Sequence, residues 1–165
     1  MRKKALFIFA LILALILSGC QKRENDSVDD LLVKLVEVSG ENFEDSGSFY
    51  FSKAREGEIG YLSGEDKALI FGKDSVSFDK LECYSGFVSA RTPAEIWVFK
   101  CYSSSDTDDV IKMCLERADG IKVALRNTEW REKTESISIK VYNRHVVFVF
   151  AENTRAVESK AQKLR

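Results

Sequence analysis

Apolar residues are arranged in two different ways along this chain of 165 residues. Residues 5–17 form one uninterrupted apolar run, "ALFIFALILALIL". After residue 27, apolar and polar residues alternate with the periods of helices and strands. The change of pattern separates an N-terminal segment from a region that is able to fold around a core.

The first half of the folding region predicts helices and few strands. Apolar residues at 3-4 spacing predict a helix over Val28–Val38, with Ser27 as its N-cap. The glycine-rich and acidic stretch that follows predicts a loop with a short strand at Phe49–Phe51. Ser63 and Asp66 have the spacing of a capping box, which predicts the start of a second, short helix.

The second half predicts two hairpins separated by a long helix. Residues 82–90 and 95–103 are strand-like and are joined by "RTPA", so we expect a first hairpin. An apolar stripe that includes Cys114 and Leu115 predicts a helix over 106–125. Alternating residues before the turn "NR" and the apolar strand 146–150 after it predict a second hairpin. A last, weakly amphipathic helix covers 154–164.

These elements predict one α+β domain over residues 28–165 with the order ααββαββα. The two hairpins are expected to form an antiparallel or mixed sheet, with the helices packed on one face.

The N-terminal segment has the features of a bacterial lipoprotein signal. Three basic residues at positions 2–4 precede the apolar run, which at ~1.5 Å per residue covers only ~20 Å of a ~30 Å hydrocarbon layer. A membrane-anchor helix that ends in cysteine is the alternative. Leu17, Ser18, Gly19 and Cys20 resemble a lipobox, in which a diacylglycerol group is attached to the cysteine and the chain is cut before it. The resemblance implies a signal peptide over 1–19 and a protein held on the outer face of the cell membrane by lipidated Cys20.

The mature chain is mildly acidic. Removal of the signal leaves 22 Lys and Arg against 26 Asp and Glu, a net charge of −4. This balance argues against nucleic acid as a partner. Residues 20–27 are polar and predict a short tether of at most ~25 Å, so the domain is expected close to the bilayer.

Candidate catalytic and metal-binding residues are few, and each has a simpler interpretation. His145 is the only histidine, and no motif supplies a nucleophile for it. Ser77–Lys80 fits the S-x-x-K motif of penicillin-recognising enzymes, but its companion motifs are missing. Asp106–Asp109 is better explained by a helix N-terminus than by a cation site. We therefore expect no catalytic residue, no metal and no cofactor.

Three cysteines remain once Cys20 is assigned to the lipid. If the first hairpin is centred on Thr92, Cys83 and Cys101 lie directly opposite each other, at a separation that permits a disulfide. Cys114 lies on the apolar stripe of the long helix and is expected in the core.

Glu95 and Arg117 are two charged residues at the border of the core. Glu95 opens an apolar strand, and Arg117 lies beside the apolar stripe of the long helix. We expect either a structural ion pair between sheet and helix or a charged lip for a ligand.

Residues 69–151 resemble the DUF4358 family, small lipoproteins of Firmicutes with a domain of unknown function. The resemblance rests on "ALIFGKD" (68–74), "GFVSARTPAEIWVFK" (86–100), "CLERAD" (114–119) and "HVVFVFAEN" (145–153). Glu95 and Arg117 fall on positions of the family pattern. The resemblance implies a lipoprotein and supplies no activity.

Three functions are consistent with these features. The first is a non-enzymatic accessory or binding module for an envelope protein or component. The second is a small-ligand carrier with a pocket between the long helix and the sheet. The third, a hydrolase of envelope material, has the weakest support because it lacks an identifiable nucleophile.

Overall fold

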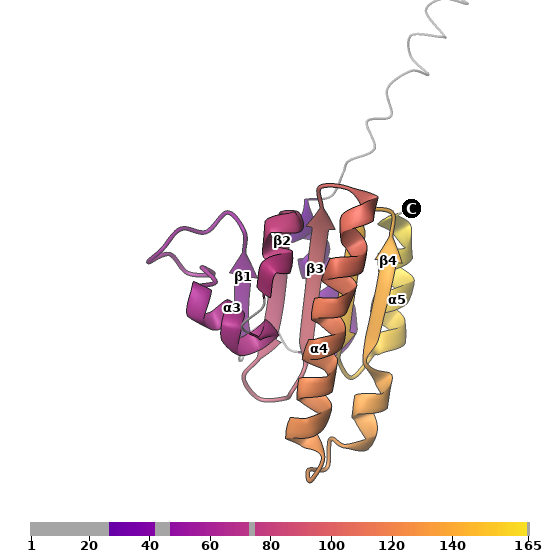
Figure 1. The fold of residues 1–165 in the computed structure, drawn as a ribbon. Coiled ribbons are helices and arrows are strands. Elements are labelled where there is room, and N and C mark those ends of the chain that lie inside the picture. The colour runs from indigo at the N-terminus through magenta and orange to yellow at the C-terminus, as the bar shows by residue number, and fades with distance from the viewer. Residues whose placement is uncertain (1–26, 42–46, 73–74, 165) are drawn as a thin grey trace, which may run out of the picture.

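The computed structural model describes residues 27–41, 47–72 and 75–164, which form a five-stranded antiparallel sheet with four α-helices (Figure 1). The single-domain α+β class predicted from the sequence is confirmed. The short strand predicted at Phe49–Phe51 is present as β1, and it joins the sheet as an additional strand that the order ααββαββα does not contain. The elements are α2 (Val28–Ser39), β1 (Gly47–Phe51), α3 (Gly64–Phe71), β2 (Leu81–Ser89), β3 (Glu95–Cys101), α4 (Thr107–Leu125), β4 (Ser138–Tyr142), β5 (His145–Phe150) and α5 (Thr154–Ala161).

Both predicted hairpins are present, and they are joined side by side. The strand order is β1-β2-β3-β5-β4, and every neighbouring pair is antiparallel. The turn between β4 and β5 has two residues, of which Asn143 has a positive φ of 55°. Such turns match the twist of a hairpin. β2, β3 and β5 each have a neighbour on both sides, whereas β1 and β4 are the two edges.

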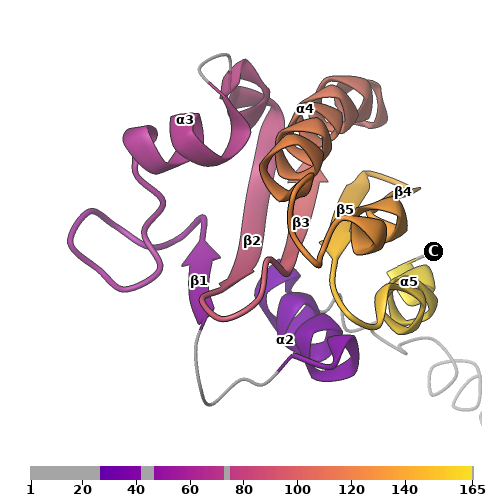
Figure 2. The same cartoon turned by 90° about the horizontal axis from the view of Figure 1, so that it is seen from below.

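The helices cover both faces of the sheet, so the prediction of helices on one face is wrong. Figure 2 shows α2 and α5 on one side of the strands and α3 and α4 on the other. The residues 96–99 of β3 are fully buried and alternate between two separate clusters, Ile96 and Val98 in the first and Trp97 and Phe99 in the second. An uninterrupted apolar strand of this kind needs a cover on each face.

The ends of the first two helices follow the predicted chemistry. The Ser27 hydroxyl accepts a hydrogen bond from Asp30 N at 3.1 Å, and Gly40 after α2 is left-handed with φ 86°. In the predicted capping box, Asp66 N donates to Ser63 Oγ at 3.0 Å and Ser63 N donates to Asp66 Oδ2 at 3.2 Å. These contacts satisfy backbone donors that a helix N-terminus leaves free.

One glycine in β2 makes room for the large aromatic residue at the centre of the sheet. Gly86 lies opposite Trp97 in the β2–β3 pair, and a Cβ at this position would lie 2.1 Å from the indole ring. Tyr50 stacks on the same ring at 5.5 Å between centroids, and Phe71 meets it edge-on at 4.9 Å. The indole is therefore held in place from three sides beside Glu95.

The N-terminal predictions concern residues outside the described part. Leu17, Ser18, Gly19 and Cys20, the signal peptide 1–19 and the first seven tether residues are all in this segment. Among the described residues, no helix combines the length and apolar character needed to cross a bilayer.

Candidate functional site

Glu95 and Arg117 meet where α4 crosses the sheet, and with Trp97 they form what we call the central seam. Arg117 Nε donates to Glu95 Oε2 at 3.0 Å, and Arg117 Nη2 donates to Glu95 Oε1. The Trp97 indole N–H donates to Glu95 Oε2 at 3.3 Å. The structure therefore brings together the two charged residues that the sequence singled out.

The central seam is closed to solvent on the side of the acid. Glu95 is 3% exposed, and its two carboxylate oxygens are both engaged by neighbouring donors. A two-pronged arginine–carboxylate contact is the geometry that best compensates a buried charge. The arrangement fits the structural alternative, and the alternative of a charged lip for a ligand finds no free carboxylate oxygen here.

Cys83 and Cys101 are not paired, so the predicted register of the first hairpin is wrong. Cys83 lies opposite Lys100, and Cys101 lies opposite Leu81 beyond a bulge. All three described cysteines are free thiols. A shift of one residue moves a side chain to the other face of a sheet. Accordingly, Cys83 packs in the cluster under α2 and α5, whereas Cys101 packs in the cluster under α4.

The three thiols are poorly suited to covalent chemistry. Burial raises the pKa of Cys101 to about 11 and raises the pKa values of Cys83 and Cys114. A thiol is nucleophilic as the thiolate, which these shifts disfavour at neutral pH. Among the described residues, no group of three or more His, Cys, Asp or Glu side chains is placed to hold a metal ion.

His145 begins β5 with its ring only partly exposed. It lies opposite Lys100 on β3 and opposite Tyr142 on β4. Its Nδ1 is buried without a hydrogen-bond partner, and burial holds its pKa below the ordinary value. A general base needs a hydroxyl or thiol within hydrogen-bond reach of its ring. This geometry gives no support to a catalytic role.

The other two motifs of the sequence contact each other. The Ser77 hydroxyl donates to the Asp109 carbonyl at 3.1 Å, and Lys80 Nζ lies 3.8 Å from Asp106 Oδ1. Asp106 precedes α4, as predicted, but its carboxylate accepts from the Ser103 backbone N–H at 3.0 Å and closes a turn before the helix. Hydrogen bonds from Ser103 lower the pKa of Asp106.

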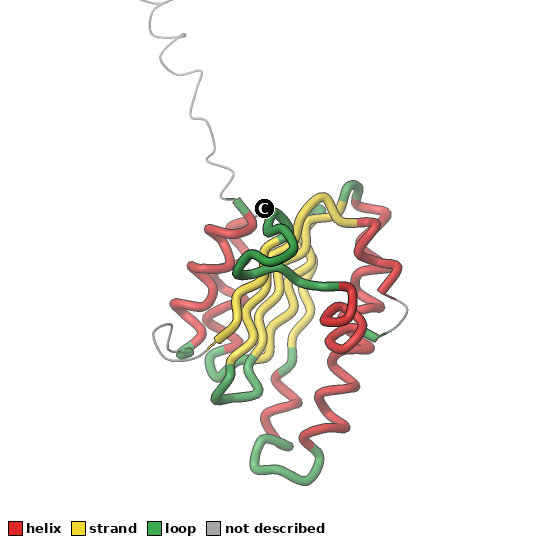
Figure 3. Tube along the Cα trace, turned by 90° about the vertical axis from the view of Figure 1, so that its left-hand side faces the viewer, coloured by secondary structure: helices red, strands yellow, loops and turns green. Residues whose placement is uncertain are grey.

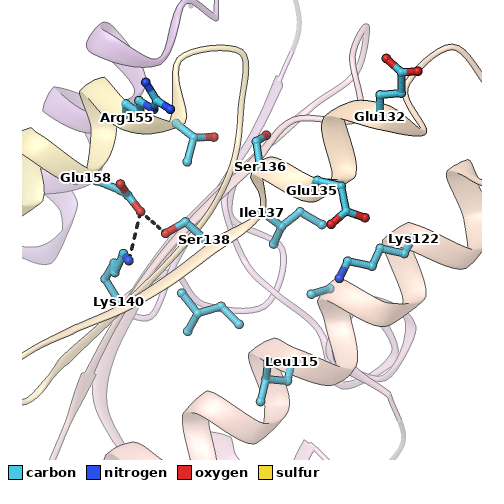
Figure 4. Close-up of a pocket in the computed structure, with 13 residues that line it drawn as sticks. Leu115, Lys122, Glu132, Glu135, Ser136, Ile137, Ser138, Lys140, Arg155 and Glu158 are labelled. Carbon is cyan, nitrogen blue, oxygen red and sulfur yellow. Dashed lines mark hydrogen bonds and ion pairs between the residues drawn. The ribbon is translucent and has the colours of Figure 1, made fainter.

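A groove of about 770 Å³ opens at the edge of the sheet, and we call it the edge groove. Its lining comes from α4, from the 3-10 turn Glu132–Ser136, from the start of β4 and from α5 (Figure 4). Figure 3 shows the helices that flank the strands on the two sides of the sheet. The groove has the volume of a ligand site, but it is open and mixes apolar with charged side chains.

The two sides of β4 give the edge groove two different walls. Ile137 and Ile139 pack against the hydrophobic cluster under α4. Leu115 of α4 is 52% exposed, although the sequence predicts it in the apolar stripe of this helix. On the other side, the Ser138 hydroxyl donates to Glu158, and Lys140 Nζ lies 3.5 Å from Glu158 Oε1. The β4 residues that face α4 are therefore apolar, and those that face α5 are polar or charged. Lys122, Glu132 and Glu135 add charged side chains to the groove outside β4.

Reasoning from the sequence identified the pair of the central seam and missed the edge groove. The groove is built by four elements, and their positions depend on the order of the strands, which local patterns do not encode. A signal was present in Ile137, Ile139 and Val141, which alternate with polar residues. This alternation indicates a strand with one solvent-exposed face, which is typical of a strand at the edge of a sheet.

Comparison with known proteins does not extend this description. The chain matches no protein-family model, no curated protein and no solved structure. The resemblance to the DUF4358 lipoproteins therefore stays a prediction from its motifs.

Proposed function

We propose that this protein is a lipid-anchored, non-enzymatic binding module on the outer face of the cell membrane. The observation that carries the anchor is the sequence Leu17-Ser18-Gly19-Cys20 after a basic and then an apolar stretch. Two acyl chains are needed for stable attachment to a bilayer, and a diacylglycerol on Cys20 provides them. The resemblance to the DUF4358 lipoproteins implies the same location on the cell membrane.

The edge groove carries the binding part of the proposal. It is an open surface that combines an exposed leucine, Leu115, with charged side chains. Apolar and charged side chains occur together in protein contact surfaces. We therefore place the binding of an envelope partner at the edge groove.

A small-ligand carrier is the second candidate, because the edge groove lies between the long helix and the sheet, as that hypothesis requires. Small-molecule sites usually enclose most of the ligand in an apolar pocket. The edge groove is open along the edge strand. This favours a macromolecular partner over an enclosed ligand. A hydrolase has the least support, because His145 meets no nucleophile.

The anchor is tested by replacing the cysteine that carries it. We expect Cys20→Ala to abolish the mass increase of a diacylglycerol group, measured by mass spectrometry on protein extracted from membranes with detergent. Cys83→Ala, which changes a cysteine of the folded domain, is the matched control and should remain lipidated. A Cys20→Ala protein that is processed and still held firmly in the membrane would exclude the lipid anchor.

The binding role is tested by crosslinking in living cells. A photoreactive amino acid at Leu115, in the edge groove, should crosslink a defined envelope partner. The same group at Val123, which is also exposed on α4 but does not line the groove, should not. Mass spectrometry identifies the partner, and equal crosslinking from the two positions would contradict a specific surface.

A further inference from the structure

The outer edge of β4 has backbone groups that are free to bind another strand. β4 pairs with β5 alone, and the two-residue turn makes Tyr142 and His145 a hydrogen-bonded pair. Because hydrogen-bonded pairs alternate, Ile139 and Val141 direct their N–H and C=O groups away from β5. Among the described residues, no strand pairs with this edge.

The opposite edge of the sheet is covered at its end by the protein's own chain. At the end of β1, the backbone N–H of Phe51 donates to the Gly60 carbonyl at 2.8 Å. A Cβ on Gly60 would lie 2.7 Å from the Phe51 ring, which shows how closely the loop follows this edge. Proteins commonly cover an edge strand to prevent unwanted pairing. The contrast makes the open edge at β4 a candidate docking surface.

The walls of the edge groove specify which side chains an added strand needs. On the α4 side, Ile139 and Leu115 line the groove, and Leu115 is 52% exposed. Val141 follows Ile139 on the same face of β4, beyond the groove, and is 43% exposed. Lys122, Glu132 and Glu135 line the groove outside β4. On the α5 side, Glu158 is engaged by Ser138 and Lys140, so the exposed Arg155 leaves this wall with an excess of positive charge. An added strand fits when its apolar residues face α4 and its acidic residues face α5.

A second copy of this chain fits the edge less well than a foreign strand. A two-fold pairing of β4 with itself is antiparallel and keeps the α5 sides of both copies on one face of the joined sheet. It would bring Lys140 and the exposed Arg155 of the two copies together, and like charges that face each other across strands are destabilising.

We propose that the outer edge of β4 binds an extended segment of a partner protein as a sixth, antiparallel strand. In this segment, apolar residues alternate with acidic residues. Main-chain hydrogen bonds supply affinity in this mode of recognition, and alternate side chains supply specificity. The inference rests on the proposed binding function and names the chemistry of its partner.

Synthetic peptides test the inference on the full lipidated protein in detergent. A capped heptapeptide of alternating valine and aspartate should bind, and a valine–lysine peptide should bind at least 10-fold more weakly. In the proposed pairing, the valines face Ile139 and Val141 and direct their N–H groups to β4. N-methylation of the valines should therefore abolish binding, whereas N-methylation of the aspartates should not.

Hydrogen exchange and one pair of variants locate the site. Bound peptide should slow amide exchange at Ile139 and Val141. Val141→Pro removes an outward N–H that β5 does not use and should abolish binding, while Val141→Thr should retain it. Unchanged melting temperatures show that both variants fold.

The results separate this inference from the proposed function. Three results would overturn the proposal of an added strand. The first is binding that does not depend on which residues of the peptide are methylated. The others are unchanged amide exchange at Ile139 and Val141 and a dimer formed through β4. Specific crosslinking from Leu115 would still support a binding module in each of these cases.

Discussion

The central seam and the edge groove both place an acid beside a cation where a helix meets the sheet, yet the two differ in exposure. Glu95 in the seam is 3% exposed, and Arg117 binds both of its oxygens. In the groove, the Lys140 side chain is 53% exposed and its contact with Glu158 is a single 3.5 Å approach. The acid and the cation are largely buried where strands continue on both sides, and they are more open to solvent where the sheet ends.

The largest effect is expected when the buried pair of the central seam loses one partner. Arg117→Ala leaves the Glu95 carboxylate buried with only the Trp97 N–H, which should lower the free energy of unfolding by about 3 kcal/mol. Urea unfolding followed by circular dichroism measures this value.

The control for this change removes both charges. The double variant Glu95→Leu, Arg117→Met replaces the pair with apolar side chains of similar size and should recover part of the lost stability. The recovery is incomplete because the buried Trp97 N–H loses its acceptor. If Arg117→Ala alone has no effect on unfolding, the charge of the central seam is not effectively buried.

A second change tests the packing of the central seam. Gly86→Ala would place a Cβ 2.1 Å from the Trp97 ring, and overpacking of this kind costs about 1–3 kcal/mol. Gly120→Ala in α4 is the control, because a Cβ there meets nothing within 4 Å and alanine favours a helix. We expect thermal unfolding to show a lower melting temperature for the first variant only.

The sequence predicted the elements better than their arrangement, for a physical reason. Periodicity and capping residues are local, so the helices, the hairpins and the caps at Ser27 and Ser63 were all correctly placed. The charged pair was found because Glu95 and Arg117 interrupt apolar patterns. Sheet order and hairpin register are not local: one shifted residue separated Cys83 from Cys101, and the two-sided burial of β3 requires helices on both faces.

His145 lies at the start of β5, at the other end of this strand from the level of Glu95 and Ser138, and is expected to make stability depend on pH. Burial holds its pKa in the folded protein below the ordinary value of about 6.5. A backbone hydrogen bond with Tyr142 and the charge of Glu82 oppose this shift of the pKa, and Lys100 and Arg144 reinforce it. Between these two values the unfolded chain binds more protons, so stability is present above pH 6.5 and is lost as the pH falls. Urea unfolding at pH 7.5 and 5.5 should show a larger loss for the wild type than for His145→Gln, and equal losses would exclude this histidine as the cause.

The smallest effect on stability is expected when the exposed ion pair of the edge groove is removed. Lys140→Ala removes an exposed ion pair, and such pairs contribute less than about 1 kcal/mol. Unfolding should therefore change little, while binding of the alternating valine–aspartate peptide should weaken because a cation of the acid-facing wall is lost. Lys163→Ala, which changes a lysine outside the groove, is the control and should leave both unchanged. Lys140→Ala could instead lower the free energy of unfolding as much as Arg117→Ala does. The ion pair of the edge groove would then be as important for stability as the pair of the central seam, and the contrast between the two regions would fail.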